Sequence, residues 1–206
     1  AGKLFIGWEI LRPADEYLSG NVREKLEWAR RSAELYPEDY SENVRALEAV
    51  QPVDLTASEI SVRLGATWLP PEIAEQFMFD LFDTPRYCQW NIHVHFSQYT
   101  GEWNVEGKSY DRTNVKAYNT DGTSRINGYK IMEETLNLKD VRIFDYIEDE
   151  NGKKTAVLNK KETAIAQGKQ ELIKQAFADW IWKDPERREK LTRLYNEKFN
   201  STRPRE

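Results

Sequence analysis

The sequence predicts an α+β fold that is rich in helices, with one or two antiparallel β-hairpins and a C-terminal pair of helices. Helix-capping signals recur along the chain, one stretch alternates strictly between apolar and polar residues, and an Asn-Gly pair separates two apolar runs. A chain of 206 residues can bury roughly 70% of its unfolded surface without a disulfide or a metal. We therefore expect one domain over residues 1–206, with a possible subdivision into 1–86, 87–158 and 159–206.

Helices are expected throughout the first third. Asn21–Glu24 has the pattern of a capping box, and the helix behind it should end at Pro37. A second, short helix is predicted over Tyr40–Val50. Thr56–Glu59 is another capping box, with Gly65 placed to stop the helix that it opens.

The middle of the chain changes period. Pro70–Glu72 opens a helix, with proline in the first turn. Trp90–Phe96 then alternates between apolar and polar residues, as a half-buried strand does. A turn over Gln98–Gly101 and renewed alternation over Glu102–Glu106 predict a hairpin, and residues 107–122 have the composition of a loop.

A further helix is expected to begin near Thr123 or Ser124. Val141–Ile147 and Thr155–Leu158 flank Asn151-Gly152, the strongest short hairpin signal in the chain.

The last third is predicted to be helical. Asn159–Glu162 caps a long helix that runs to about Lys183, and Asp184-Pro185 starts the next helix. The tail Ser201–Glu206 resembles a linker. The expected apolar surface of the long helix consists of Ile165, Leu172, Ile173, Ala176, Phe177 and Trp180.

Composition excludes several classes of protein. With 7 Trp, 10 Tyr and 8 Phe the chain has the aromatic content of a folded protein, and a single cysteine, Cys88, excludes an internal disulfide. No apolar run approaches the roughly 20 residues of a membrane span. The N-terminus lacks the layout of a signal peptide. We expect a soluble, cytoplasmic protein with no membrane partner.

Charge is distributed unevenly around the net value of -5. Residues 1–86 carry 9 basic and 16 acidic residues, residues 87–152 carry 7 and 11, and residues 153–206 carry 14 and 8. The basic last segment is where a polyanion would bind. The alternative is a solvated surface of charge pairs, such as Glu189 four residues before Arg193. The candidates for contacts to nucleic-acid phosphates are Arg125, Lys130, Lys160, Lys161, Lys169, Lys174, Arg187, Arg188 and Arg193.

Catalytic motifs are absent from the sequence. It has no phosphate-binding G-x-x-x-x-G-K-[ST] loop, no dinucleotide-binding G-x-G-x-x-G and no G-x-S-x-G nucleophile elbow. His93 and His95 share one face of the predicted strand and are weak candidates for a metal site, with Glu102 or Glu106 as a third ligand. The alternative is that both are polar residues on the wet face of that strand. We expect no cofactor and no enzyme activity from this chain.

Two aromatic residues near the C-terminus are candidates for contacts to other domains. Trp180 is expected in the core, whereas Trp182 lies on the other side of the same helix. Trp182 and Phe199 are therefore the candidates for an exposed apolar patch.

Long runs of this sequence are similar to a known segment. They are Ala14–Arg23, LGATWLPPE (Leu64–Glu72), EWNVEGK (Glu102–Lys108), Thr123–Tyr146 and Glu162–Glu206. Together they resemble part of the very large DNA methyltransferase–helicase proteins of bacterial conjugative elements and phages. In that family the segment lies between an adenine-specific methyltransferase region and a SWI/SNF-type, ATP-binding helicase region.

The resemblance implies a non-catalytic accessory domain of a mobile-element DNA helicase/methyltransferase in the bacterial cytoplasm. The family's catalytic motifs have no match here, so no catalytic residue is carried over. Expected partners are DNA and the neighbouring helicase and methyltransferase domains. Two alternatives remain: a protein-interaction spacer between those domains, and a metal-dependent enzyme using His93 and His95.

Overall fold

The computed structural model describes residues 2–8 and 10–206, which form two compact units. One unit combines residues 1–60 with 188–206, and the other consists of residues 61–187. This division differs from the subdivision at residues 86 and 158 that composition suggested. The two units are described separately below, as unit 1 and unit 2.

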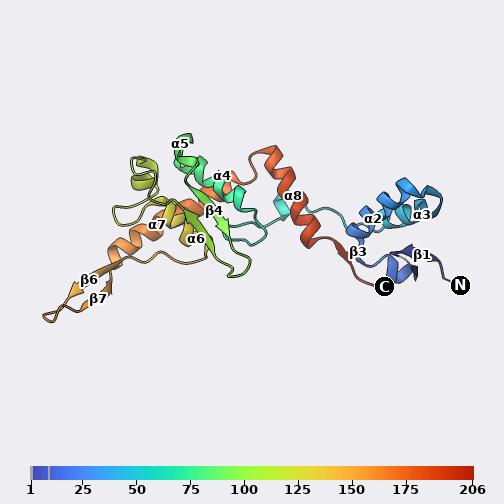
Figure 1. The fold of residues 1–206 in the computed structure, drawn as a ribbon, viewed down its shortest axis with the longest axis horizontal. Helices are drawn as coiled ribbons and strands as arrows, with labels where there is room; N and C mark the ends of the chain where they lie inside the picture. The colour runs from blue at the N-terminus through green and yellow to red at the C-terminus, as the bar shows by residue number, and fades with distance from the viewer. Residues whose placement is uncertain (1, 9) are drawn as a thin grey trace. The chain divides into compact units, whose positions relative to one another are not determined.

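Unit 1 combines short strands with the helices of the N-terminal segment (Figure 1). Its hydrophobic core contains Phe5 and Tyr17, whose rings stack with centroids 5.1 Å apart, together with Leu26 and Leu47 from two helices. The Tyr17 hydroxyl accepts a hydrogen bond from the buried Asn43 amide. Its elements are β1 (Leu4–Gly7), β2 (Ile10–Pro13), α1 (Ala14–Tyr17), β3 (Gly20–Asn21), α2 (Val22–Leu35), α3 (Pro37–Glu48), the 3-10 turn η1 (Ala57–Glu59), most of α8 (Pro185–Phe199) and β8 (Thr202–Arg203).

Unit 2 surrounds a core of aromatic and aliphatic side chains. Phe77 meets Phe177 edge to face, and Phe82 meets Tyr129 in the same way, which joins three helices around one centre. Its elements are α4 (Pro71–Phe82), α5 (Arg86–Gln89), β4 (His93–Phe96), β5 (Trp103–Glu106), the π-helical turn η2 (Lys116–Thr120), α6 (Gly128–Leu136), β6 (Phe144–Glu148), β7 (Lys154–Leu158), α7 (Lys160–Trp180) and the start of α8.

The predicted α+β class is confirmed, including both expected hairpins and the helical pair α7 and α8. In the first hairpin β4 pairs antiparallel with β5, His93 opposite Glu106. In the second, β6 pairs with β7, Phe144 opposite Leu158, around the Asn-Gly turn. The caps at Asn21 and Asn159 are also confirmed, since each side chain accepts the N–H of the glutamate three residues later.

Two predicted helix starts were wrong. Thr56 and Glu59 do form a reciprocal capping box, but Ile60 is already extended, so the box closes only η1. Gly65 has φ +88° and lies where a Cβ would meet the Leu136 carbonyl oxygen at 2.5 Å, so it permits a close approach to the end of α6. Thr123 likewise forms a turn, in which its hydroxyl accepts two N–H groups, and α6 begins after the Asn127 cap.

Strand and tail assignments also change. Trp90 ends α5 and is exposed, so the strand begins at His93 rather than at Trp90. Leu4–Gly7 and Ile10–Pro13, which carried no prediction, pair as the antiparallel strands β1 and β2. The tail is not a free linker, because β8 pairs with β3 and Arg205 forms an ion pair with Asp15 at 2.5 Å.

A buried carboxylate fixes α6 against the first hairpin. The Glu133 side chain is only 9% exposed and accepts the Val105 N–H of β5 at 2.8 Å. Lys108 and Lys130 each contact it at 2.6–2.7 Å, one on each carboxylate oxygen. A buried charge is tolerated only when it is paired and hydrogen-bonded in this way.

Replacement of Glu133 by alanine is expected to destabilise unit 2 by about 3 kcal/mol, because it leaves the Val105 N–H and the Lys108 ammonium without their acceptor. The matched control is Glu134→Ala, which removes a more exposed partner of Lys130 and should cost less than about 1 kcal/mol. Denaturant unfolding measures both. Equal costs would contradict the role given to Glu133.

Glu133 also predicts an acid dependence of stability. Burial raises its pKa, but hydrogen bonds from Lys108 and Lys130 outweigh burial and leave the pKa below the ordinary value of 4.5. A carboxylate with a lowered pKa stabilises the fold at higher pH and loses this contribution as pH falls through its folded pKa. The free energy of unfolding should therefore fall more steeply below about pH 4.5 in the natural chain than in Glu133→Gln. Parallel pH profiles would refute this.

Candidate functional site

Residues 139–143 lie alongside helix α7 without a strand partner. The Gln170 amide nitrogen donates to the Lys139 carbonyl oxygen at 2.7 Å, and the Gln170 amide oxygen accepts the Val141 N–H at 3.2 Å. Gln170 is 2% exposed, so these bonds are shielded from water. One side chain thus fixes both ends of a three-residue stretch.

Two further side chains of α7 continue this pattern. Gln167 donates to the Val141 carbonyl oxygen at 3.0 Å. The Thr163 hydroxyl accepts the Ile143 N–H at 2.9 Å and donates to the Ile143 carbonyl oxygen at 3.3 Å. Residues three and four apart share a helix face. We call Thr163, Gln167 and Gln170, with their bonds to residues 139–143, the α7 ladder.

The α7 ladder determines which side chains of the segment face solvent. Val141 and Ile143 are buried, whereas Arg142 and Phe144 are exposed. The alternation that predicted a strand from Val141 is therefore real, but strand pairing begins only at Phe144, because helix side chains bond the backbone before that point. Lys139 and Arg142 are held on the surface by a rigid support.

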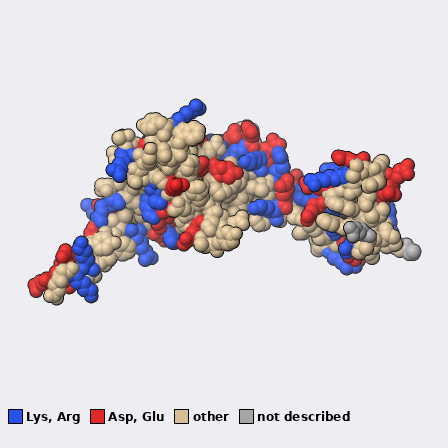
Figure 2. All heavy atoms as spheres, in the orientation of Figure 1, with Lys and Arg blue, Asp and Glu red and all other residues tan. Residues whose placement is uncertain are grey.

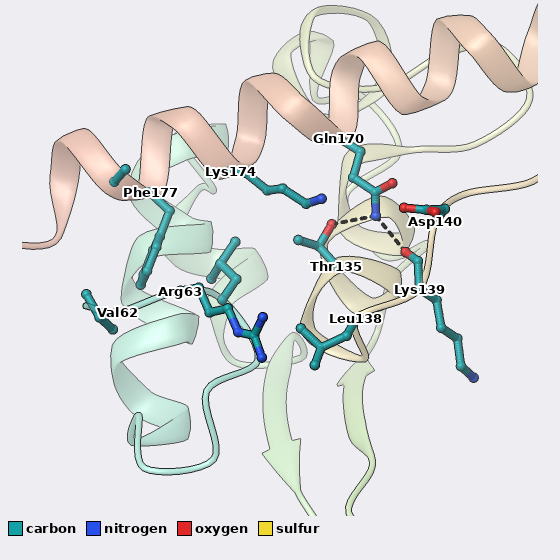
Figure 3. A pocket seen from close by; sticks show the side chains of 11 residues that line it. Val62, Arg63, Thr135, Leu138, Lys139, Asp140, Gln170, Lys174 and Phe177 are labelled. Carbon is teal, nitrogen blue, oxygen red and sulfur yellow. Dashed lines mark hydrogen bonds between the residues drawn. The ribbon is translucent and has the colours of Figure 1, made fainter.

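Two adjoining hollows flank this segment, and both are lined by Lys139 and Asp140. The first hollow has a volume of about 400 Å³ and is also lined by Arg63, Lys174 and Phe177. Figure 3 shows Lys174 reaching from α7 toward this space, with Arg63 entering from the other side. The second hollow, about 470 Å³, is lined in addition by Ile126, Lys130, Glu134, Val141, Arg142 and Phe144.

Positive charge predominates in the two linings, which contain five basic and two acidic residues. We call the five basic residues the basic surface: Arg63, Lys130, Lys139, Arg142 and Lys174. The side chains of Arg63, Lys139 and Arg142 form no ion pair with any residue in the described ranges. On the face that Figure 2 shows, acidic and basic residues intermingle.

Three residues predicted from the sequence belong to this region. Lys130 lines the second hollow, although it also pairs with Glu133 and Glu134. Lys174 lines the first hollow and pairs with Glu171 of its own helix. Arg125 lies next to the second hollow, because it donates to the Phe144 carbonyl oxygen at 3.0 Å.

Other predicted residues lie apart from the two hollows. Lys160 and Lys161 are exposed in the first turn of α7, and Lys169 donates to the Thr120 carbonyl oxygen at 2.7 Å. Arg188 and Arg193 belong to unit 1, where Arg193 pairs with Glu189 at 3.0 Å.

Arg187, a predicted contact to phosphates, is buried and bonded within the protein. It is 8% exposed, its guanidinium lies 3.5 Å from the Trp180 ring centroid, and it donates to the carbonyl oxygens of Trp180 and Ile181. Trp180 itself is half-buried against Phe77, and its indole nitrogen donates to Asp80. Arg187 therefore locks the turn between α7 and α8 and does not face solvent.

The two histidines do not converge on a common ligand. His93 contacts Glu75 and the Trp90 carbonyl oxygen, whereas His95 contacts Glu106 across the hairpin. Over residues 2–8 and 10–206, no three His, Cys, Asp or Glu side chains come together as metal ligands. A metal site at His93 and His95 gains no support from this geometry.

The exposed apolar patch expected at Trp182 and Phe199 is not found as one surface. Trp182 is half-buried, whereas Phe199 is 58% exposed and its ring lies tilted against that of Tyr195, with centroids 5.0 Å apart. Because Trp182 and Phe199 belong to different units, they are not grouped into one patch.

Sequence reasoning missed Arg63, Lys139 and Arg142. All three lie in segments of net negative charge, so averaging charge over segments concealed them. The usable signal was the alternation from Val141 onward, which places Arg142 on the polar side of a half-buried segment, whereas Lys139 precedes that alternation and is not indicated by it.

Comparison with known proteins gives one match. A family model described as "Domain of unknown function (DUF8437)" matches residues 63–201. No curated protein matches the chain. No solved structure matches it either. In the described parts of the chain, no helix combines the length and apolarity needed to cross a bilayer.

The α7 ladder predicts the effect of removing one of its members. Gln170→Leu keeps the size of the side chain but leaves the Val141 N–H and the Lys139 carbonyl oxygen without partners, which should cost about 2–4 kcal/mol. The amide of Val141 should then exchange with solvent much faster. The control is Gln175→Leu, since the exposed Gln175 bonds only to Asp179. Undiminished protection of Val141 in Gln170→Leu would contradict the ladder.

Proposed function

We propose that this chain, which belongs to the family described as a domain of unknown function (DUF8437), binds nucleic-acid phosphates through the basic surface. The observation that carries this proposal is the pair of adjoining hollows around residues 139–143, with three cations that lack acidic partners in the described ranges. The role is that of a non-catalytic accessory domain, which positions DNA for catalytic regions elsewhere. The resemblance to DNA methyltransferase–helicase proteins is the reason for expecting such catalytic regions.

Local charge supports a polyanion as the ligand. The two linings sum to a formal charge of about +3 in a chain whose net charge is -5. An excess of positive charge in a concave surface attracts phosphates and releases their counterions. Phosphate contacts position a protein on DNA but carry no sequence information, so we expect binding with little base preference.

The rigidity of the support also favours this function. Lys139 and Arg142 project from a backbone that the α7 ladder holds in place. Cations on a fixed backbone lose less conformational entropy on binding than cations on a mobile loop. Lys130 and Lys174 already have acidic neighbours, so we assign them a smaller contribution than Lys139 and Arg142.

The proposal predicts salt-dependent DNA binding. The full chain should bind labelled single-stranded, duplex and forked DNA, with an affinity that falls linearly in log salt. The double variant Lys139→Ala/Arg142→Ala should reduce the slope for duplex DNA by about 1.8, since each phosphate contact contributes about 0.9. Fluorescence anisotropy across a salt series measures both quantities.

A matched control is Arg86→Ala/Lys183→Ala, which removes two exposed cations of the same unit outside both hollows. It makes the same change in net charge and should keep the original slope. If both double variants weaken binding equally, the contact is diffuse and the basic surface is not the site. If the natural chain does not bind DNA even at low salt, the proposal fails.

A second function is favoured by the hairpin β6–β7. Two-stranded hairpins are marginal by themselves, and this one exposes five large apolar side chains: Phe144, Tyr146, Ile147, Val157 and Leu158. We propose as the alternative that the hairpin contacts a neighbouring domain of the longer protein, so that the chain is a protein-interaction spacer. The helicase region is the first partner to test.

Substitutions on the hairpin separate the two functions. Tyr146→Ser/Ile147→Ser removes two exposed apolar side chains and should leave the salt slope for DNA unchanged. If the spacer function holds, the same variant should lower affinity for the helicase region in a pull-down or calorimetric assay. The control is Lys153→Ala/Lys154→Ala at the end of the same hairpin. Unchanged affinity of the Tyr146/Ile147 variant would exclude the hairpin as the contact.

A further inference from the structure

We propose that the first hollow is a binding site for a small organic anion, with a carboxylate or phosphate on an apolar body. This inference goes beyond DNA binding: the site shares Arg63 and Lys174 with the basic surface, but it adds an apolar lining and does not need Arg142. The volume of about 400 Å³ lies in the range of small-molecule sites, roughly 300–1,000 Å³. It suits a medium-chain carboxylate or a mononucleotide.

The floor of the first hollow is apolar. Leu138, which is 58% exposed and has φ +58°, supplies apolar surface to the lining together with the half-buried Val62, and the buried side chains of Leu64 and Phe177 lie behind them. Apolar ligand atoms placed there leave water, which favours binding by about 25 cal/mol per Å² of buried area. The body of the ligand should therefore be apolar or aromatic.

The two uncharged polar side chains of the wall, Gln170 and Thr135, already use their hydrogens within the protein. Gln170 uses both amide hydrogens, one for the Lys139 carbonyl oxygen and one for the Thr135 hydroxyl. Thr135 in turn donates its hydroxyl hydrogen to the Ile131 carbonyl oxygen at 2.7 Å. Neither side chain has a hydrogen left for a ligand. The wall can therefore accept an apolar body but offers no donor that would select a neutral polar ligand.

Charge recognition falls to the cations that line the hollow, Arg63, Lys139 and Lys174, which outnumber the single carboxylate of Asp140. Arg63 has no ion pair with any residue that the structure describes, and its side chain lies beside the hollow together with that of Lys174 (Figure 3). Lys174 pairs with Glu171 three residues away on an exposed helix surface, and such pairs are weak enough to be exchanged for a ligand. An anionic head group at the mouth would meet Arg63 and Lys174.

Titration of the full chain with matched probes tests this site. The pairs are octanoate with octanol, and AMP with adenosine, each followed by amide chemical shifts. We expect saturable shifts at Leu64, Thr135 and Phe177 with at least one anion, and weaker binding of its neutral counterpart. Saturable binding of octanoate would indicate a carboxylate ligand. AMP indicates a nucleotide phosphate, and competition by a 5′-phosphorylated oligonucleotide then separates a strand end from a free nucleotide.

The variant Arg63→Ala/Lys174→Ala should lower the affinity for the anion that binds about tenfold, since it removes two charge-assisted contacts at a surface site. Arg86→Ala/Lys183→Ala makes the same charge change outside the hollow and should leave affinity within about twofold, as expected for screened distant charges. Absence of saturable binding by both anions would overturn the proposal. Equal binding of the neutral probes, or full affinity in the Arg63/Lys174 variant, would also overturn it.

Discussion

The candidate site depends on how one unpaired backbone segment satisfies its hydrogen bonds. Residues 139–143 have no neighbouring strand, yet Val141 and Ile143 are buried, where polar backbone groups need partners. Three side chains of α7 supply most of those partners, and the backbone N–H of Asn159 bonds the Ile143 carbonyl oxygen at 2.8 Å. This constraint places Val141 in the core, leaves Arg142 on the surface and separates the two hollows. Within the C-terminal half of α6, which leads into this segment, the buried Glu133 fixes the helix to β5.

Local signals predicted helix starts well where the cap residue had no competing role. Asn21 and Asn159 both cap as expected, because each amide oxygen accepts an N–H three residues on. Thr123 failed because its hydroxyl closes a turn, and Asn127 takes the cap instead. A capping pattern indicates only that a helical turn can begin at that residue. Tertiary packing decides whether a helix continues from it.

The buried face of α7 could not be read from hydrophobicity. Its buried positions include Thr163, Gln170 and Ile173, whereas Ile165 and Leu172, which looked like core residues, are exposed. The helix turns polar side chains inward because residues 139–143 need hydrogen-bond partners there. The same pairing brings Lys139 and Lys174 to one hollow across 35 positions of sequence, so the site arises from tertiary contacts that spacing does not encode.

Cross-linking of the full chain to DNA, with the attached peptides mapped by mass spectrometry, tests the central claim most directly. Photoreactive single-stranded and duplex DNA would be bound at low salt and irradiated. We expect cross-links in peptides that contain Arg63, residues 126–144 and Lys174, all from unit 2. Cross-links confined to residues 1–60 and 188–206, or no cross-links, would contradict a DNA contact at the basic surface.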